Sequence, residues 1–162
     1  MVLKGVMPML ADLKPLAAEL NQLSDSFTEE LKQLEKELND LNLGIEVEVT
    51  TGGALVEGER TAIDPDDVIN GPDAGRWVTE REVVLLAFGQ TSNGRWRLLS
   101  RHYRHLYGRL EDEEWRLEEV RPLLEETRPI RLAASHRIAH LVGLINDEAK
   151  RKIAAVKEVI KK

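Results

Sequence analysis

The most informative part of the chain is residues 77–110, WVTEREVVLLAFGQTSNGRWRLLSRHYRHLYGRL. Residues 77–90 and 95–110 are rich in the aliphatic, β-branched and aromatic residues that are typical of strands, and Asn93-Gly94 lies between them. Asn-Gly between two such runs is the strongest short-range signal for a β-hairpin with a two-residue turn. The sequence therefore predicts two long antiparallel strands joined by a tight turn.

A two-residue turn would also fix which residues lie opposite each other, because side chains alternate between the two faces of a strand. The pairs predicted on one face are Phe88 with Leu99, Leu86 with Arg101, Val84 with Tyr103, Glu82 with His105, and Glu80 with Tyr107. The other face carries Trp77, Leu85, Leu98, Leu106 and Leu110, which are more uniformly apolar. We therefore expect that second face to be the core.

Shorter strands are predicted on both sides of this hairpin. Ile45, Val47 and Val49 alternate with polar residues, and Gly52-Gly53 turns into a second strand near residues 54–60. A last strand is expected near residues 115–120, with Trp115 and Leu117 on the predicted core face. Residues 44–120 thus form an antiparallel meander of four or five strands.

A long amphipathic helix is predicted before the sheet, over residues 12–43, with residues 1–11 as a candidate disordered segment. Its apolar residues recur at steps of three and four: Leu13, Leu16, Leu20, Leu23, Phe27, Leu31, Leu34, Leu38 and Leu41. Pro15 suits the first turn of a helix. Ser26 and Glu29 form a capping box, which leaves open whether the helix continues through Ser24–Ser26.

A second long helix is predicted after the sheet, over residues 122–162. Pro122 suits its first turn, Pro129 should restart or kink it, and the apolar stripe that follows is Ile138, Val142, Ile145, Ala149, Ile153, Val156 and Ile160. The predicted fold class is α+β: residues 1–162 form a single domain in which both long helices pack on one face of the sheet.

Composition limits the chemistry and the location of the chain. The 162 residues include no cysteine, which removes disulfides, thiolate nucleophiles and thiolate metal sites, and no cofactor is predicted. Residues 1–10 are short, contain Gly5 and Pro8, and match neither a signal peptide nor a membrane span. We therefore expect a cytoplasmic protein without a membrane partner.

Arginines and aromatic residues alternate along the second strand of the hairpin. Arg95, Arg97, Leu99, Arg101, Tyr103, His105, Tyr107 and Arg109 share one face at period two. Such a stripe suits phosphate, single-stranded nucleic acid or a carboxylate ligand. It can equally be neutralised by neighbouring acidic strands, and we favour that alternative, with Glu82 beside His105 and Glu118 near Tyr107. Candidate ligand-binding residues are Arg97, Arg101, Glu80 and Glu118.

Two other groups of residues are candidates for chemistry. His105, Glu82, Tyr103 and Tyr107 can move protons and are the candidate catalytic set. His136 and His140 are four residues apart, the spacing at which two imidazoles can share a metal, but Arg137 stands where a zinc protease motif has its general base. We predict no metal site and keep this pair only as a weak candidate.

The leading hypothesis is a non-catalytic binding or assembly protein that holds a protein or an anionic small molecule on the Arg/Tyr face. Val84, Leu86, Phe88 and Leu99 would leave that face too apolar for water, which predicts a homodimer. The alternatives are a small hydrolase or isomerase that uses the Glu/His/Tyr cluster, and single-stranded nucleic-acid binding, which the net charge of −6 disfavours. Whether this face is open, a pocket or a dimer interface separates the three.

Overall fold

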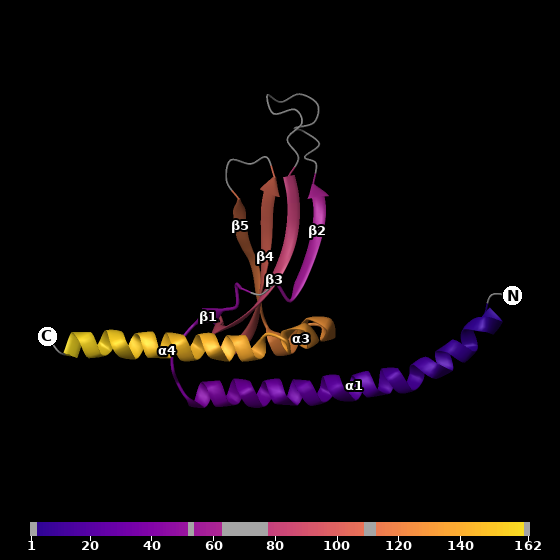
Figure 1. Ribbon diagram of the computed structural model, residues 1–162, viewed down its shortest axis with the longest axis horizontal. Coiled ribbons are helices and arrows are strands. Elements are labelled where there is room, and N and C mark those ends of the chain that lie inside the picture. Colours follow the sequence, from indigo (N-terminus) through magenta and orange to yellow (C-terminus); the bar gives the residue numbers. More distant parts are fainter. Residues whose placement is uncertain (1–2, 52–53, 63–77, 109–112, 161–162) are drawn as a thin grey trace, which may run out of the picture.

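The computed structural model describes residues 3–51, 54–62, 78–108 and 113–160. Helix α1 (Leu3–Asp40) precedes the strands β1 (Val47–Glu48), β2 (Val56–Ala62), β3 (Val78–Gln90), β4 (Trp96–Gly108) and β5 (Glu114–Pro122). The 3₁₀ turn η1 (Leu123–Glu125) and the helices α3 (Arg128–Ala134) and α4 (Ile138–Ile160) follow. Two long helices thus bracket an antiparallel sheet (Figure 1), and the predicted α+β class is confirmed.

The hairpin of β3 and β4 forms the centre of the sheet. On one side β3 pairs with β1 and with β2 in succession, and on the other side β4 pairs with β5. The helices lie across the end of the sheet where β3 ends and β4 begins, and the other half of the strands extends away from them (Figure 1). We call these the helix end and the far half of the sheet.

The turn between β3 and β4 differs from the predicted two-residue turn. The Thr91 amide donates to the Arg95 carbonyl at 2.8 Å, and Gly94 has a positive φ of 81° and donates to Thr91, also at 2.8 Å. This is a three-residue loop whose last residue is left-handed, a turn that also suits an Asn-Gly sequence. The predicted register is therefore wrong by one residue: Phe88 lies opposite Leu98, and Glu82 lies opposite Arg104.

A shift of one residue exchanges the faces of one strand relative to the other. The core therefore takes the face of β3 that was predicted to be outward, and the face of β4, with Leu98, that was predicted to be core. Its members include Val84, Leu86, Phe88 and Leu98 from the hairpin, Leu31 and Leu38 from α1, and Leu141 and Ile145 from α4. Leu99 is also fully buried. The four apolar residues that predict a dimer are thus covered within the chain, and that argument for a homodimer is wrong. Trp77 and Leu110 lie outside the described residues.

Helix α1 is continuous from Leu3 to Asp40, so Ser24–Ser26 do not interrupt it. Ser24 is buried, and its carbonyl accepts a hydrogen bond from the Thr28 hydroxyl at 2.8 Å, as one turn of a helix allows. The helix also begins earlier than predicted, which places Pro15 in its interior and not in its first turn. Prolines inside a helix remove backbone hydrogen bonds and bend it, and the N-terminal part of α1 is visibly curved (Figure 1).

The C-terminal region is not one helix over residues 122–162. Pro122 ends β5, η1 follows directly, and Pro129 stands in the first turn of α3 as a proline at that position should. The helix breaks again at residues 135–137, where both the amide and the hydroxyl of Ser135 donate to the Leu132 carbonyl. These bonds three residues back tighten the last turn of α3 and end it.

Two glycines, one in the hairpin turn and one in helix α4, should respond oppositely to replacement by alanine. Gly94→Ala should lower the free energy of unfolding by about 1–2 kcal/mol, because its backbone is left-handed. Gly143→Ala should instead raise it by about 0.5–1 kcal/mol, since Gly143 lies inside α4 and a methyl group there meets no atom within 4 Å. Urea denaturation of both variants measures this, and equal effects of the same sign would contradict the turn described above.

Candidate functional site

The face of the sheet opposite the core carries most of the Arg/Tyr stripe, and we call it the open face. The strand pairing places Arg101 opposite Leu85, Tyr103 opposite Val83, and His105 opposite Arg81. On the other side of β4, Val120, Leu117 and Trp115 lie opposite these same three residues. Trp115 and Leu117 therefore lie on the open face and not on the core face where they were predicted.

A bulge in β5 explains how this strand presents three apolar residues to one side. Leu117 and Val120 are three residues apart and would point to opposite faces of a regular strand. The pairing with β4 shifts by one residue between His102 and Tyr103, which inserts an extra residue into β5 and restores the alternation. Trp115, Leu117 and Val120 are all exposed, by 51%, 51% and 42% respectively. They form an apolar strip along the edge strand.

A groove of about 450 Å³ lies on the open face beside this strip. Its lining residues come from the two hairpin strands, their neighbours and the segment between β1 and β2: Glu48, Thr50, Ala54, Arg81, Val83, Leu85, Tyr103 and Trp115. The floor is largely aliphatic, and charged groups of both signs stand at its sides. The groove therefore offers both apolar contact and hydrogen bonds to an occupant.

Arg101 and Tyr103 are both tied to Glu48 of β1. The Tyr103 hydroxyl donates to Glu48 at 2.7 Å, and the Arg101 guanidinium pairs with Glu48 and with Glu46. Burial, the hydrogen bond to Glu48 and the charge of that carboxylate raise the pKa of Tyr103 to about 12. Burial opposes the charge on Arg101, but the two carboxylates raise its pKa above the ordinary value. Near neutral pH Tyr103 is therefore protonated, and Arg101 is charged with its charge balanced by the two carboxylates.

His105 is held mainly by aromatic stacking. Its ring stacks on Trp115 with 4.0 Å between centroids and on Tyr107 with 5.0 Å, while the Arg81 guanidinium lies 5.4 Å from the centre of the Tyr107 ring. His105 Nε2 is 3.2 Å from a Glu113 carboxylate oxygen, and its buried Nδ1 has no hydrogen-bond partner among the described residues. A general base must reach the proton that it accepts, and the nitrogen of His105 without a described partner is buried.

The carboxylates predicted beside His105 and Tyr107 lie on the other face of the sheet. Glu80 is 3.0 Å and Glu118 is 2.8 Å from nitrogens of Arg104, and Glu82 is 3.9 Å from His102 Nδ1. For Glu80 and Glu82 the one-residue error in register is the reason, because it moves every side chain of β4 to the opposite face relative to β3. Glu118 lies at the bulge in β5. The structure thus brings Arg101, Tyr103, His105 and Tyr107 together and separates them from Glu80, Glu82 and Glu118.

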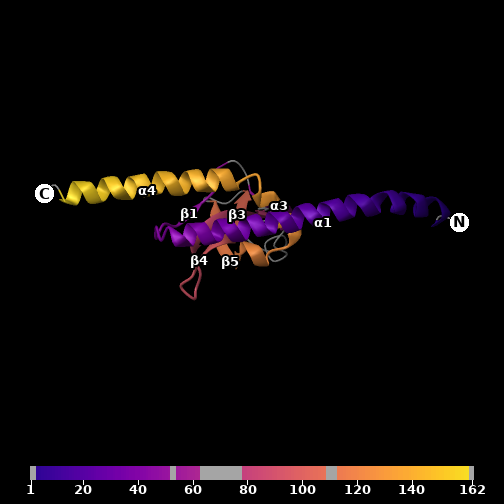
Figure 2. The ribbon, with the colours of Figure 1, turned by 90° about the horizontal axis from the view of Figure 1, so that it is seen from below.

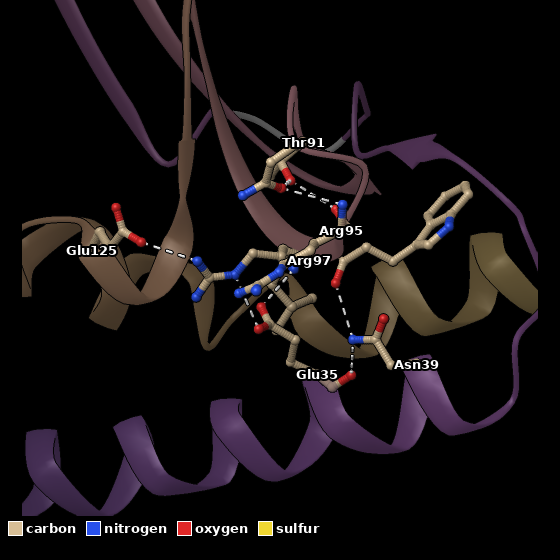
Figure 3. A network of polar contacts seen from close by, with 9 residues as sticks. Glu35, Asn39, Thr91, Arg95, Arg97 and Glu125 are labelled. Atoms are coloured by element: carbon tan, nitrogen blue, oxygen red, sulfur yellow. Dashed lines mark hydrogen bonds and ion pairs between the residues drawn. The ribbon is translucent and has the colours of Figure 1, made fainter.

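Arg97 takes part in the contact between α1 and the hairpin (Figure 3). Its guanidinium binds Glu35 of α1 at 3.2 Å and Glu125 of η1 at 3.0 Å. The second oxygen of Glu35 accepts the Leu98 amide at 2.9 Å, and the Asn39 side chain donates to the Trp96 carbonyl at 3.0 Å. Arg97 therefore fixes the helix to the strand, and no ligand is needed to explain its position.

The structure does not support a metal site at the pair His136 and His140. His136 lies in the break before α4, and His140 lies in α4 with its Nε2 3.5 Å from the Thr51 hydroxyl. The two histidines therefore do not share a continuous helix. Among the described residues, no three histidines or carboxylates gather closely enough to hold a metal ion.

A buried polar network on the core face was not predicted. Glu126 follows η1, its side chain is fully buried, and one of its oxygens accepts the Ser100 hydroxyl at 2.6 Å and lies 2.5 Å from His102 Nε2. Burial alone would raise the pKa of Glu126, but the hydrogen bonds from Ser100 and His102 and the charge of His102 hold it below the ordinary value. Ser100 is wholly buried and binds the carboxylate that His102 also binds, so this is not a nucleophile activated by a base.

None of the described helices has the length and apolarity that crossing a membrane requires. Comparison of the chain with family models, with curated proteins and with solved structures gave no match.

Proposed function

We propose that this chain is a non-catalytic binding protein that holds an extended segment of another polypeptide on its open face, along β5. The observation that carries the proposal is the apolar strip of Trp115, Leu117 and Val120, which stays exposed beside a groove of about 450 Å³. Exposed apolar strips next to a groove are typical of protein interaction sites.

The position of β5 at the edge of the sheet favours a polypeptide over a small molecule. Among the described strands, only β4 pairs with β5, and every residue of β5 from Glu114 to Arg121 is exposed. An edge strand offers unpaired amide and carbonyl groups that an added strand can bind, while side-chain pockets supply selectivity. The groove and the strip would supply those pockets.

The state of the titratable groups favours binding over catalysis. The Tyr103 proton is held by Glu48, the acidic residue of the candidate catalytic set, Glu82, is on the other face, and His105 stacks on two rings. A general base must reach its proton within hydrogen-bond distance and be free to accept it. The hydrolase or isomerase alternative therefore has less support than it had from the sequence.

The pairing of the arginines also favours a polypeptide over an anion or a nucleic acid. Arg97, Arg101 and Arg104 each contact two carboxylates within the chain. Nucleic-acid affinity depends on cations that replace the counterions of phosphates, and these cations already have counterions. Within the stripe, Arg97 and Arg101 are thus paired with carboxylates, which leaves apolar and backbone contacts as the main source of affinity.

The proposal predicts that affinity for extended peptides depends on the apolar strip. A display library of random twelve-residue peptides, selected on the immobilised chain, should yield binders whose affinity falls by roughly 10–100-fold for the double variant Trp115→Ser, Leu117→Ser. Titration calorimetry of the selected peptides measures the change. The matched control is Arg116→Ser, on the same strand but on its other face, which should leave affinity within about twofold.

Amide hydrogen exchange of the complex identifies the site directly. The bound peptide should slow exchange in β5, because its edge amides would acquire partners. Peptides that bind the double variant as tightly as the unmodified chain, or that protect α1 in place of β5, would overturn the proposal.

A further inference from the structure

Each long helix extends past the sheet as an exposed arm. We define the N-terminal arm as residues 13–23 of α1 and the C-terminal arm as residues 150–160 of α4. Leu13, Leu16, Leu20 and Leu23 are exposed by 49–60%, and Ile153, Val156, Val159 and Ile160 by 55–77%. We propose that the N-terminal arm of one copy of this chain packs against the C-terminal arm of a second copy.

Packing within the chain becomes sparse along both arms. In α1 the buried core residue nearest the N-terminus is Leu31, Phe27 packs against the core cluster before it, and within the arm Arg128 donates a hydrogen bond to Asn21. In α4 the last core residue is Ile145, and the Lys152 ammonium still donates to the Gly44 carbonyl at 2.8 Å. Each arm therefore continues an apolar stripe that is buried in the body of the molecule and then left uncovered.

The two stripes match in spacing and in length. The leucines of the N-terminal arm follow steps of three, four and three residues, and Ala149, Ile153, Val156 and Ile160 follow steps of four, three and four. This alternation is the one that packs side by side in coiled coils. Each arm has eleven residues and a length of roughly 16 Å, so each can cover the other fully.

The charges favour contact between unlike arms. The N-terminal arm carries Glu19 and Lys14 and therefore no net charge, whereas the C-terminal arm carries Lys150, Arg151, Lys152 and Lys157 against Glu158 alone. At 100° per residue, Glu19 flanks the leucine stripe, and Lys150 and Lys157 flank the isoleucine and valine stripe. Two C-terminal arms would therefore set like positive charges side by side, whereas an N-terminal arm offers them Glu19 and no excess of positive charge.

The directions of the arms make this contact intermolecular. The N-terminal arm extends beyond one side of the sheet and the C-terminal arm beyond the opposite side, in both views (Figures 1 and 2). The two arms of one copy therefore cannot reach each other. Because different surfaces meet, the contacts can close as a reciprocal two-fold pair or continue head to tail as a chain of copies.

A mixing experiment with two variants tests the proposal. Leu16→Gln, Leu20→Gln removes the N-terminal stripe, and Ile153→Gln, Val156→Gln removes the C-terminal stripe, with residues that favour a helix. Sedimentation of the full chain should show self-association that each double variant weakens by on the order of 100-fold. An equimolar mixture should again associate, as pairs of unlike variants, because one intact N-terminal arm then meets one intact C-terminal arm.

Several results would overturn this proposal. A monomeric unmodified chain at high concentration removes it, and so does a mixture that fails to associate. If only one double variant loses association, like arms pair and the proposal is wrong.

Ala18→Gln and Ala154→Gln, on the same arms but away from the stripes, are the control variants. They should associate as the unmodified chain does, and thermal unfolding checks that every variant is folded. Variants of Trp115 and Leu117 should leave this association intact, which separates it from peptide binding on the open face.

Discussion

Replacing Phe88 by alanine is expected to lower the free energy of unfolding by about 3–5 kcal/mol, as for other large side chains removed from a core. Phe88 is 2% exposed, lies in the core cluster with residues of α1 and α4, and has its ring centroid 5.7 Å from that of Trp96. Chemical denaturation followed by circular dichroism measures the loss. Since the helices pack on this end of the sheet, the variant should lose helical and strand signals together.

Trp115→Ala is the matched control for Phe88→Ala. Trp115 is larger but half exposed and contacts the protein mainly through its stack on His105, so its removal should cost no more than about 1.5 kcal/mol. The two aromatic residues lie on opposite faces of the sheet. If Trp115→Ala proved as costly as Phe88→Ala, the assignment of the core to the face of Phe88 would be wrong.

Glu126→Ala should also lower the free energy of unfolding by about 3–5 kcal/mol at neutral pH, because removing one partner of a buried charged network leaves the others unsatisfied. Ser100 and His102 both bind this carboxylate, and its side chain is fully buried. Glu125→Ala is the control: this neighbouring carboxylate is 63% exposed in its ion pair with Arg97, and its loss should cost less than about 1 kcal/mol.

The effect of Glu126→Ala should depend on pH with a definite sign. The pKa of Glu126 is lowered in the folded chain, so the unfolded chain binds a proton more tightly at this position. The stabilisation is complete above the ordinary glutamate pKa of about 4.3 and is lost as the pH falls toward the folded value. The difference between the unmodified chain and Glu126→Ala should therefore shrink on acidification; a difference that stays constant to pH 3 would contradict a carboxylate role.

The sequence predicts the elements well because their signals are local. The leucine steps of α1, the alternation in β1 and the Asn93-Gly94 turn each depend on a few neighbouring residues, and all three correspond to elements of the fold. The register between β3 and β4 depends on whether the turn has two residues or three, and Asn-Gly suits both. One residue of difference was enough to exchange the two predicted faces of β3, while the faces of β4 are as predicted.

For the candidate site, the sequence predicted which residues of one strand share a face, but not which residues of other strands contact them. Period two correctly placed Arg101, Tyr103, His105 and Tyr107 on one face, because that is a property of β4 alone. Their partners depend on pairing across strands, so Glu113 and not Glu82 contacts His105, and Glu48 binds Tyr103. In the buried network Glu126 contacts Ser100, 26 positions away, and His102, 24 positions away. These contacts depend on the turn after Pro122, and no local sequence pattern predicts them.

The far half of the sheet extends beyond the helices, which gives the two halves different tolerance to change over evolution. Residues at the helix end are constrained by close packing, where altering even one methylene group is felt. Trp115, Leu117, Arg104 and the partners of Arg104 are not members of the core cluster. Substitutions at these positions should therefore alter the proposed peptide-binding surface at small cost to folding, while the scaffold stays the same.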